Sequence, residues 1–284
     1  MKQQKHEHKR TPLGGQAIVE GVLIKAPEKY AMAVRLPTGK IRTKQVNAPS
    51  LSQKNKALGL PLIRGVVNLI DMLILGIRAL TWSANQQGEE EELGMWEWLF
   101  TFAIAIGLTV GLFVLLPYYA AAFFLPREMI LFDLLDGFFR LIIFLLYLLV
   151  IGLSKDVQRM FQYHGAEHMA VHCYEHGKNL NVKNVRRYPP EHPRCGTSLL
   201  FFVVVVSIVL FSIVRTEYWY YNLVARVLLI PVVAALSYEV LKLTAKHPAL
   251  SILSYPGLIV QKLTTRKPKS DQIEVAIAAV ECAK

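Results

Sequence analysis

Long apolar runs alternate with basic, polar stretches along the 284 residues of the chain. The apolar runs cover residues 98–125, 138–153, 198–214 and 221–241. Each is close to the roughly 20 residues that a helix needs to cross the apolar layer of a bilayer. Pro231 interrupts the last run, which is tolerated where neighbouring helices satisfy the freed carbonyl. The pattern predicts an α-helical polytopic membrane protein with about four transmembrane helices, two within 97–153 and two within 198–241.

Residues 1–60 follow a different pattern. The stretches 17–27 and 30–46 are rich in β-forming side chains, and the Pro-Thr-Gly sequence at 37–39 supplies a turn within the second stretch. This part of the chain is therefore expected to form a small β-rich unit that contains an antiparallel sheet or hairpin.

Residues 61–84 have helical periodicity, but three charged side chains interrupt the apolar face. These side chains are Arg64, Asp71 and Arg78. We therefore expect an amphipathic helix that lies at the membrane interface or dips into it, rather than a fifth span. The segment 61–96 contains an acidic run after this helix, which we interpret as a solvated linker.

The polar stretches after the second and fourth predicted spans are 154–197 and 242–284. No proline occurs between Leu141 and His176, so the second span is predicted to continue as one helix that ends near Gly177. Residues 242–284 are expected to form an interfacial segment followed by a C-terminal helix.

Basic residues are concentrated on one side of the predicted spans, with 28 of the 32 Lys and Arg residues. The other four are Arg127, Arg140, Arg215 and Arg226. Arg140 is expected to extend from its span toward the interface. Because cytoplasmic segments carry the excess of basic residues, both termini and the segment 154–197 are expected in the cytoplasm. The net charge of +11 is explained by this topology and by attraction to anionic lipid headgroups, so no specific nucleic-acid partner is predicted.

Four of the eight histidines are spaced four residues apart in one short segment. On a helix of 3.6 residues per turn, His164, His168 and His172 lie on one face, which Glu167 and Glu175 share. Solubility alone does not favour imidazole over Lys or Glu at such positions. The face is therefore a candidate metal-binding stripe.

His164 and His168 enclose Glu167 in an H-x-x-E-H sequence. Two histidines at i and i+4 can bind one metal ion, and the glutamate can act as general base on a metal-bound water, as in inverzincin-type hydrolases. His172 lies about 12 Å along the helix axis from His164, so it either supports the other ligands or binds a second ion. A divalent ion, most simply Zn²⁺, is the expected cofactor.

The loop before the third span offers further ligands. His192 and Cys195 are of the types that bind zinc, and Arg194 can hold a carboxylate or a phosphate. The candidate catalytic residues are Glu167 and Arg194, and the candidate metal ligands are His164, His168, His172, Glu175, His192 and Cys195. The three cysteines are too few for a disulfide framework. An alternative without metal stays open, in which the histidines hydrogen-bond to lipid phosphates or to one another.

Five stretches together resemble the YqhQ-like family of bacterial membrane proteins. They are 14–22 (GGQAIVEGV), 64–80, 161–175 (FQYHGAEHMAVHCYE), 192–198 (HPRCGTS) and 264–280. The resemblance implies a multi-pass protein of the bacterial cytoplasmic membrane, in a largely uncharacterised family of predicted metal-dependent enzymes. It implies the same candidate ligands and adds Gln16 and Glu20. For Glu20 a role as ligand, as base or in capping the fold stays open.

The leading hypothesis for function is a membrane-embedded, metal-dependent hydrolase whose cytoplasmic site acts on a lipid headgroup or a membrane-associated peptide. The alternative is a non-catalytic membrane-protein biogenesis factor that associates with a translocon, an insertase or a ribosome. A metal transporter fits the sequence less well, because the predicted spans contain almost no ionisable residues. Glu239, the one candidate, is expected to pair with Lys242.

Overall fold

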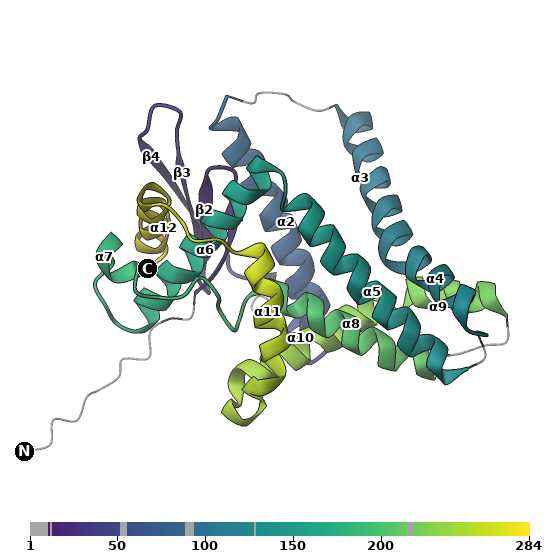
Figure 1. The fold of residues 1–284 in the computed structure, drawn as a ribbon. Coiled ribbons are helices and arrows are strands. Elements are labelled where there is room, and N and C mark those ends of the chain that lie inside the picture. Colours follow the sequence, from purple (N-terminus) through teal and green to yellow (C-terminus); the bar gives the residue numbers. More distant parts are fainter. Residues whose placement is uncertain (1–10, 12, 52–55, 89–93, 128, 215–217) are drawn as a thin grey trace, which may run out of the picture.

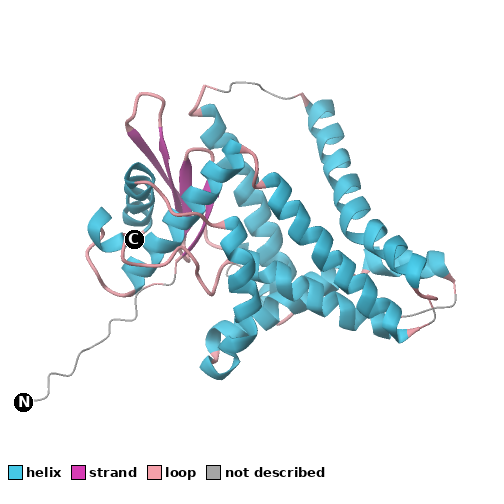
Figure 2. Ribbon diagram, in the orientation of Figure 1, coloured by secondary structure: helices cyan, strands magenta, loops and turns pink. Residues whose placement is uncertain are grey.

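The computed structural model describes residues 11, 13–51, 56–88, 94–127, 129–214 and 218–284. Most of these residues are helical, and a small sheet lies at one end of the molecule (Figure 1, Figure 2). The helix Ile63–Asn85 contacts both the sheet and the apolar helix Ile230–Lys246, and so joins the two parts of the molecule.

The N-terminal unit is a four-stranded antiparallel sheet in the order β1-β2-β3-β4. The strands are β1 (Gly14–Ile18), β2 (Gly21–Lys25), β3 (Lys29–Arg35) and β4 (Ile41–Asn47). Gly39, with φ of 83°, lies in the turn between β3 and β4, where glycine avoids the strain that a side chain would cause. The predicted antiparallel sheet is therefore confirmed.

Helices cover both faces of the sheet. They are α2 (Ile63–Asn85) on one face, and α6 (Lys155–Glu175) with α12 (Ser270–Ala283) on the other. Leu23 packs in the cluster that contains Leu75 of α2, whereas its neighbour Val22 packs in the cluster that contains Tyr163 of α6. Successive residues of a strand point to opposite faces, so β2 contributes to both cores and is buried throughout except at Lys25.

Three helical segments are long and apolar enough to cross a membrane. The first combines α3 (Met95–Val110), the π-helical turn η2 (Gly111–Leu115) and α4 (Leu116–Phe124); the others are α5 (Ile130–Ile151) and α8 (Gly196–Ile213). The number is four if α9 (Trp219–Leu228) and α10 (Ile230–Lys246), which meet at 50°, form one bent span. Pro231 lies in the first turn of α10, where its missing N–H costs no helical hydrogen bond.

Short helices complete the described part of the chain. They are η1 (Lys56–Gly59), α7 (Val182–Val185), η3 (Pro248–Ser254) and α11 (Tyr255–Thr264). On the long helices, large apolar side chains remain exposed, such as Trp96 at 83%, Phe123 at 84% and Val150 at 64%. Apolar surface of this extent is typical of contact with lipid or with another protein.

The expectation for Arg140 is wrong, because this residue is buried in an ionic network that it shares with Arg226. Arg226 Nη2 lies 2.8 Å from Asp133 Oδ1, and its other amino group pairs with Asp136. Arg140 Nη2 lies 2.8 Å from Asp136 Oδ2, and Nη1 donates to Ser207 Oγ on α8. Two acidic residues in α5 neutralise the two arginines, so Arg140 has a partner inside the bundle and does not extend outward. The expectation of spans almost free of ionisable residues is wrong for the same reason.

The second predicted span does not continue into the histidine helix. α5 ends at Ile151, and α6 begins at Lys155 after a turn. Gly152 and Ser154 favour this break, since glycine is a poor helix former and serine commonly precedes a helix. Gln158 Nε2 donates to the Gly152 carbonyl at 3.0 Å and so satisfies a group that the ended helix leaves free.

Glu239 does not pair with Lys242 as expected. Arg64 of α2 binds it through two hydrogen bonds, with Nε 2.7 Å from Oε1 and Nη2 2.5 Å from Oε2. This bidentate contact joins α2, which covers the sheet, to α10.

Arg226→Met is expected to lower the free energy of unfolding of the detergent-solubilised protein by about 3–5 kcal/mol, because the buried carboxylates of Asp133 and Asp136 lose a partner. Arg78→Met, at an exposed position of α2, is the control and is expected to change stability by less than about 0.5 kcal/mol. Thermal unfolding followed by circular dichroism measures both variants. Equal midpoints would contradict a stabilising role for the network.

Candidate metal centre

The loop between α6 and α8 folds back along α6. The ring of His192 lies 4.4 Å from that of His172 and 5.6 Å from that of His168, measured between centroids. Cys195 Sγ lies 3.3 Å from His164 Nε2. The histidine helix and the loop therefore meet, which their positions in the sequence did not establish.

The candidate ligands divide into two clusters. The Cys195 cluster contains His164, His168 and Cys195, and the Glu175 cluster contains His172, Glu175 and His192. Within each cluster, one ligand atom per residue lies within 4.8 Å of the others. The helical rise predicts the separation of His172 from His164. His192 and Cys195 are close in sequence and both of zinc-binding types, but the structure places them in different clusters.

In the Cys195 cluster, backbone carbonyls determine which nitrogen of each histidine faces the site. His164 Nδ1 lies 2.9 Å from the Thr264 carbonyl, and His168 Nδ1 lies 2.6 Å from the Pro190 carbonyl. Because a carbonyl only accepts, both Nδ1 atoms carry the proton, and both Nε2 atoms keep a lone pair. This is the arrangement that supports histidine ligands in metal sites.

The donor atoms of the Cys195 cluster fit zinc. Bond lengths of about 2.0–2.1 Å to nitrogen and about 2.3 Å to sulfur place these ligands about 3.5 Å apart in a tetrahedral site. The observed distance of 3.3 Å between His164 Nε2 and Cys195 Sγ is close to this value. Burial raises the pKa of the Cys195 thiol and lowers the pKa of His168 well below its usual value. The imidazole is thus in its metal-binding form, whereas the thiol would need a nearby cation to lose its proton.

In the Glu175 cluster the ligand groups already contact an arginine and backbone groups. Arg194 forms an ion pair with Glu175, and the other carboxylate oxygen of Glu175 lies 3.3 Å from His192 Nε2. His192 Nδ1 accepts from the backbone N–H of Arg194 at 3.2 Å, and His172 Nε2 lies 2.9 Å from the Glu191 carbonyl. A guanidinium beside the carboxylate opposes the binding of a second cation. Arg194 is held by Glu175 here, not free to clamp a substrate as expected.

Glu167 is buried next to the Cys195 cluster. Burial raises the pKa of its carboxyl to about 8, an effect that His164 opposes and Cys195 reinforces. Its Oε2 lies 3.4 Å from His168 Nε2. Since burial disfavours the charge on both groups, the contact joins a protonated carboxyl to a neutral imidazole. Glu167 therefore holds a proton beside two candidate ligands.

Gln261 of α11 fixes the loop that carries these ligands. Its fully buried amide accepts from the backbone N–H of His192 at 2.9 Å and donates to the His192 carbonyl at 2.9 Å and to Ser198 Oγ at 2.8 Å. Sequence reasoning missed this residue. The available signal was a single glutamine within the mainly apolar segment 247–263.

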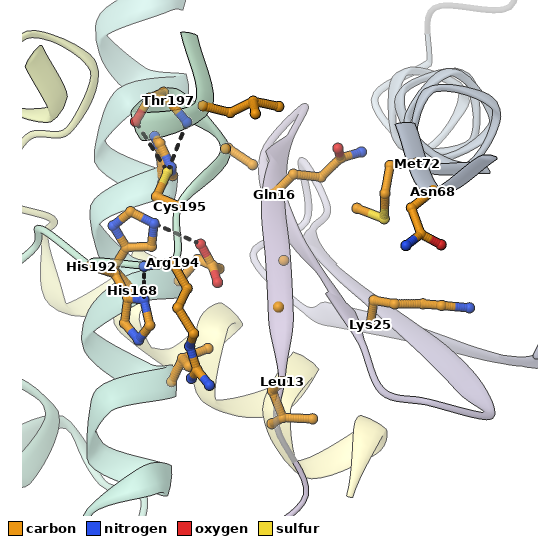
Figure 3. A pocket seen from close by; sticks show the side chains of 18 of the residues that line it. Leu13, Gln16, Lys25, Asn68, Met72, His168, His192, Arg194, Cys195 and Thr197 are labelled. Carbon is orange, nitrogen blue, oxygen red and sulfur yellow. Dashed lines mark hydrogen bonds and ion pairs between the residues drawn. The ribbon is translucent and has the colours of Figure 1, made fainter. Parts of the chain in front are cut away.

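Of the two residues added by the family resemblance, Gln16 lines the neighbouring cavity with its side chain directed toward α2, and Glu20 lies away from the site. Gln16 lines a cavity of about 740 Å³ together with His164, Glu167 and Cys195 (Figure 3). Glu20, in the β1–β2 turn, pairs with Arg159 and accepts from the Tyr163 hydroxyl at 3.2 Å. These contacts join the turn to α6.

The chelator-treated protein is expected to be most stable near pH 6.5. Burial lowers the pKa of His172 and His192 to about 4, so unfolding takes up protons and stability is lost as the pH falls from 6.5 toward 4. The raised pKa of Glu167 acts oppositely, and stability is lost as the pH rises toward about 8. Thermal unfolding midpoints across pH 4–9 measure the loss of stability on both sides of pH 6.5. Glu167→Gln should abolish the fall above pH 6.5; an unchanged fall would contradict this assignment.

Comparison with known proteins identifies the family. Residues 60–284 match the family described as protein of unknown function (DUF1385). The chain is also 33% identical over 296 residues to the uncharacterized protein YqhQ of Bacillus subtilis (strain 168), which covers 95% of this chain and 92% of the relative. No solved structure matches. The chain therefore belongs to the DUF1385 family of YqhQ-like proteins, and the matched region contains both histidine clusters.

Proposed function

We propose that the protein is a membrane-embedded, metal-dependent hydrolase with Zn²⁺ in the Cys195 cluster. The observation that carries the proposal is the buried carboxyl of Glu167, which lies 3.4 Å from a ligand nitrogen at the wall of a cavity of about 740 Å³. Perturbed titratable groups that converge in a cavity are typical of catalytic sites. A structural zinc site would use four protein ligands, whereas this cluster offers three.

In the proposed hydrolysis, the metal ion, Glu167 and the two histidines have different roles. Zn²⁺ in this position supplies a Lewis acid and lowers the pKa of a bound water. A bound cation would favour the ionised form of Glu167, and the carboxylate would then take up a proton and return it to the leaving group, a role for which a pKa near neutrality is suited. His164 and His168 are oriented by the carbonyls of Thr264 and Pro190, so their Nε2 atoms stay directed at the site.

The proposed position of the site is the cytoplasmic surface of the bacterial inner membrane. The three apolar helical segments and their exposed side chains support membrane insertion. The excess of basic residues in the segments that surround the site supports a cytoplasmic orientation of both termini. The substrate would be a lipid headgroup or a membrane-associated peptide, since only three residues separate the end of the apolar helix α5 from the start of α6.

A non-catalytic biogenesis factor bound to a translocon, an insertase or a ribosome is the second candidate. It is favoured by the exposed basic side chains of Lys183, Arg186 and Arg187, which are clustered at α7. Anionic lipids would contact the same surface in either function.

The purified protein is expected to contain about one zinc ion per chain, and His164→Ala/His168→Ala should lose it. His172→Ala should retain it, because the Glu175 cluster satisfies its own groups. His176→Ala, at an exposed position of the same helix end, is the matched control. Plasma mass spectrometry measures the metal content. No metal in the wild type after zinc reconstitution would reject the hydrolase and favour the biogenesis factor.

Glu167→Gln should retain zinc and lower turnover by about 10²–10⁴-fold, because the amide cannot accept the proton. The measurement compares the products that the two proteins release from inverted bacterial membrane vesicles, by mass spectrometry of lipids and peptides. A variant with full turnover and bound zinc would rule out Glu167 as the base.

A further inference from the structure

β1 is an edge strand that lies beside the candidate metal centre. The sheet begins with β1, which pairs only with β2 among the described strands. Residues 14–17 line the same cavity as His164, Glu167 and Cys195. Figure 3 shows the strand that carries Gln16 between two groups of side chains. His168 and Cys195 lie on one side of the strand, and Asn68 and Met72 of α2 lie on the other.

The register identifies the backbone groups that point away from β2. Ile18 and Gly21 pair across a two-residue turn, so they form a hydrogen-bonded pair, and the alternation of an antiparallel ladder directs Gly15 and Ala17 outward. Within the described part of the chain, no hydrogen bond satisfies the N–H or C=O of Gly15 or Ala17 on this side. Only the next outward N–H, that of Val19, has a partner, Ser83 Oγ at 3.1 Å.

One face of β1 lies close to Glu167 at Gly15. A Cβ atom added to Gly15 would lie 2.9 Å from Glu167 Oε1 and 2.4 Å from the Leu23 carbonyl, so only glycine fits here. A chain paired with Gly15 would therefore pass beside the buried carboxyl. Unpaired backbone groups two residues apart, about 7 Å, match the repeat of an extended peptide.

The charges of the cavity do not suit a phosphate. Among its lining residues the basic side chains are Lys25 and Arg194. Lys25 Nζ donates to the Ala48 carbonyl, and Arg194 forms an ion pair with Glu175. Much of the remaining lining is apolar, including Met72, Phe161 and Leu199, and such walls suit the side chains of a peptide.

We propose that β1 binds an extended peptide as an added strand and that this peptide is the substrate. The inference rests on the proposed hydrolase function and selects a peptide over a lipid headgroup. In the reaction, the oxygen of water bonds to the carbonyl carbon of the peptide, the C–N bond breaks, and the nitrogen leaves as an amine after a proton passes through Glu167. Strand addition provides backbone hydrogen bonds that do not depend on sequence, and the apolar walls select side chains.

The test compares acetohydroxamate with a peptide hydroxamate, acetyl-Leu-Ala-Val-Leu-hydroxamate, on the full-length, zinc-loaded protein. Isothermal titration calorimetry measures both affinities. The two probes share the zinc-binding group, so the difference reports the peptide part. We expect the peptide probe to bind at least about tenfold more tightly. N-methylation of its amides, one at a time, should weaken binding about tenfold at alternate positions only, since alternate N–H groups of an added strand face β1.

Ala17→Pro removes an outward N–H without breaking the pairing with β2, and it should weaken the peptide probe about tenfold while leaving acetohydroxamate unchanged. Thr43→Pro is the matched control, because Thr43 occupies an outward position of the opposite edge strand β4. If Ala17→Pro fails to fold, the N-methylated probes still test whether the peptide pairs with β1 in the wild-type protein.

The outcomes separate the two proposals. Zinc-dependent binding of acetohydroxamate without any gain from the peptide part would overturn the peptide inference and leave the hydrolase in place. Strand addition would also be overturned if the peptide probe bound more tightly than acetohydroxamate but N-methylation did not weaken its binding at alternate positions. Absence of zinc and of acetohydroxamate binding would overturn the hydrolase, and the peptide inference with it.

Discussion

The close approach of the chain at Gly165 is the constraint on which the candidate metal centre depends. A Cβ atom there would lie 2.3 Å from the Arg266 carbonyl and 3.3 Å from Pro190 Cβ, so only glycine lets two segments lie against α6 at this point. The carbonyls that orient His164 and His168 come from these segments, at Thr264 and Pro190. Packing of backbone against a helix thus sets the direction of both imidazoles.

Burial then determines the chemistry of the two clusters. Burial shifts the pKa values of Glu167, His168 and Cys195 toward their uncharged forms. The Glu175 cluster differs because Arg194 supplies its positive charge. The two clusters therefore differ in charge, and the reason is one guanidinium.

Ion pairs join helices and strands that are far apart in the sequence. Arg64 and Glu239 join the helix that covers the sheet to α10. Glu20 and Arg159 join the first hairpin to α6. Within the apolar helices, Arg226 binds carboxylates of α5, so α9 and α5 are joined away from water, where a charge without a partner is costly.

The sequence by itself determined the local features: the antiparallel strands around the Pro-Thr-Gly turn, the apolar helices, and the face shared by His164, Glu167 and His168. Periodicity and turn residues encode these, because they depend on neighbours within a few positions. Only the tertiary structure decided that Gln261 holds the loop, that His192 and Cys195 belong to different clusters, and that Arg140 is buried against Ser207 of α8. These outcomes depend on contacts between residues up to about a hundred positions apart, and no local pattern specifies which side chains such contacts bring together.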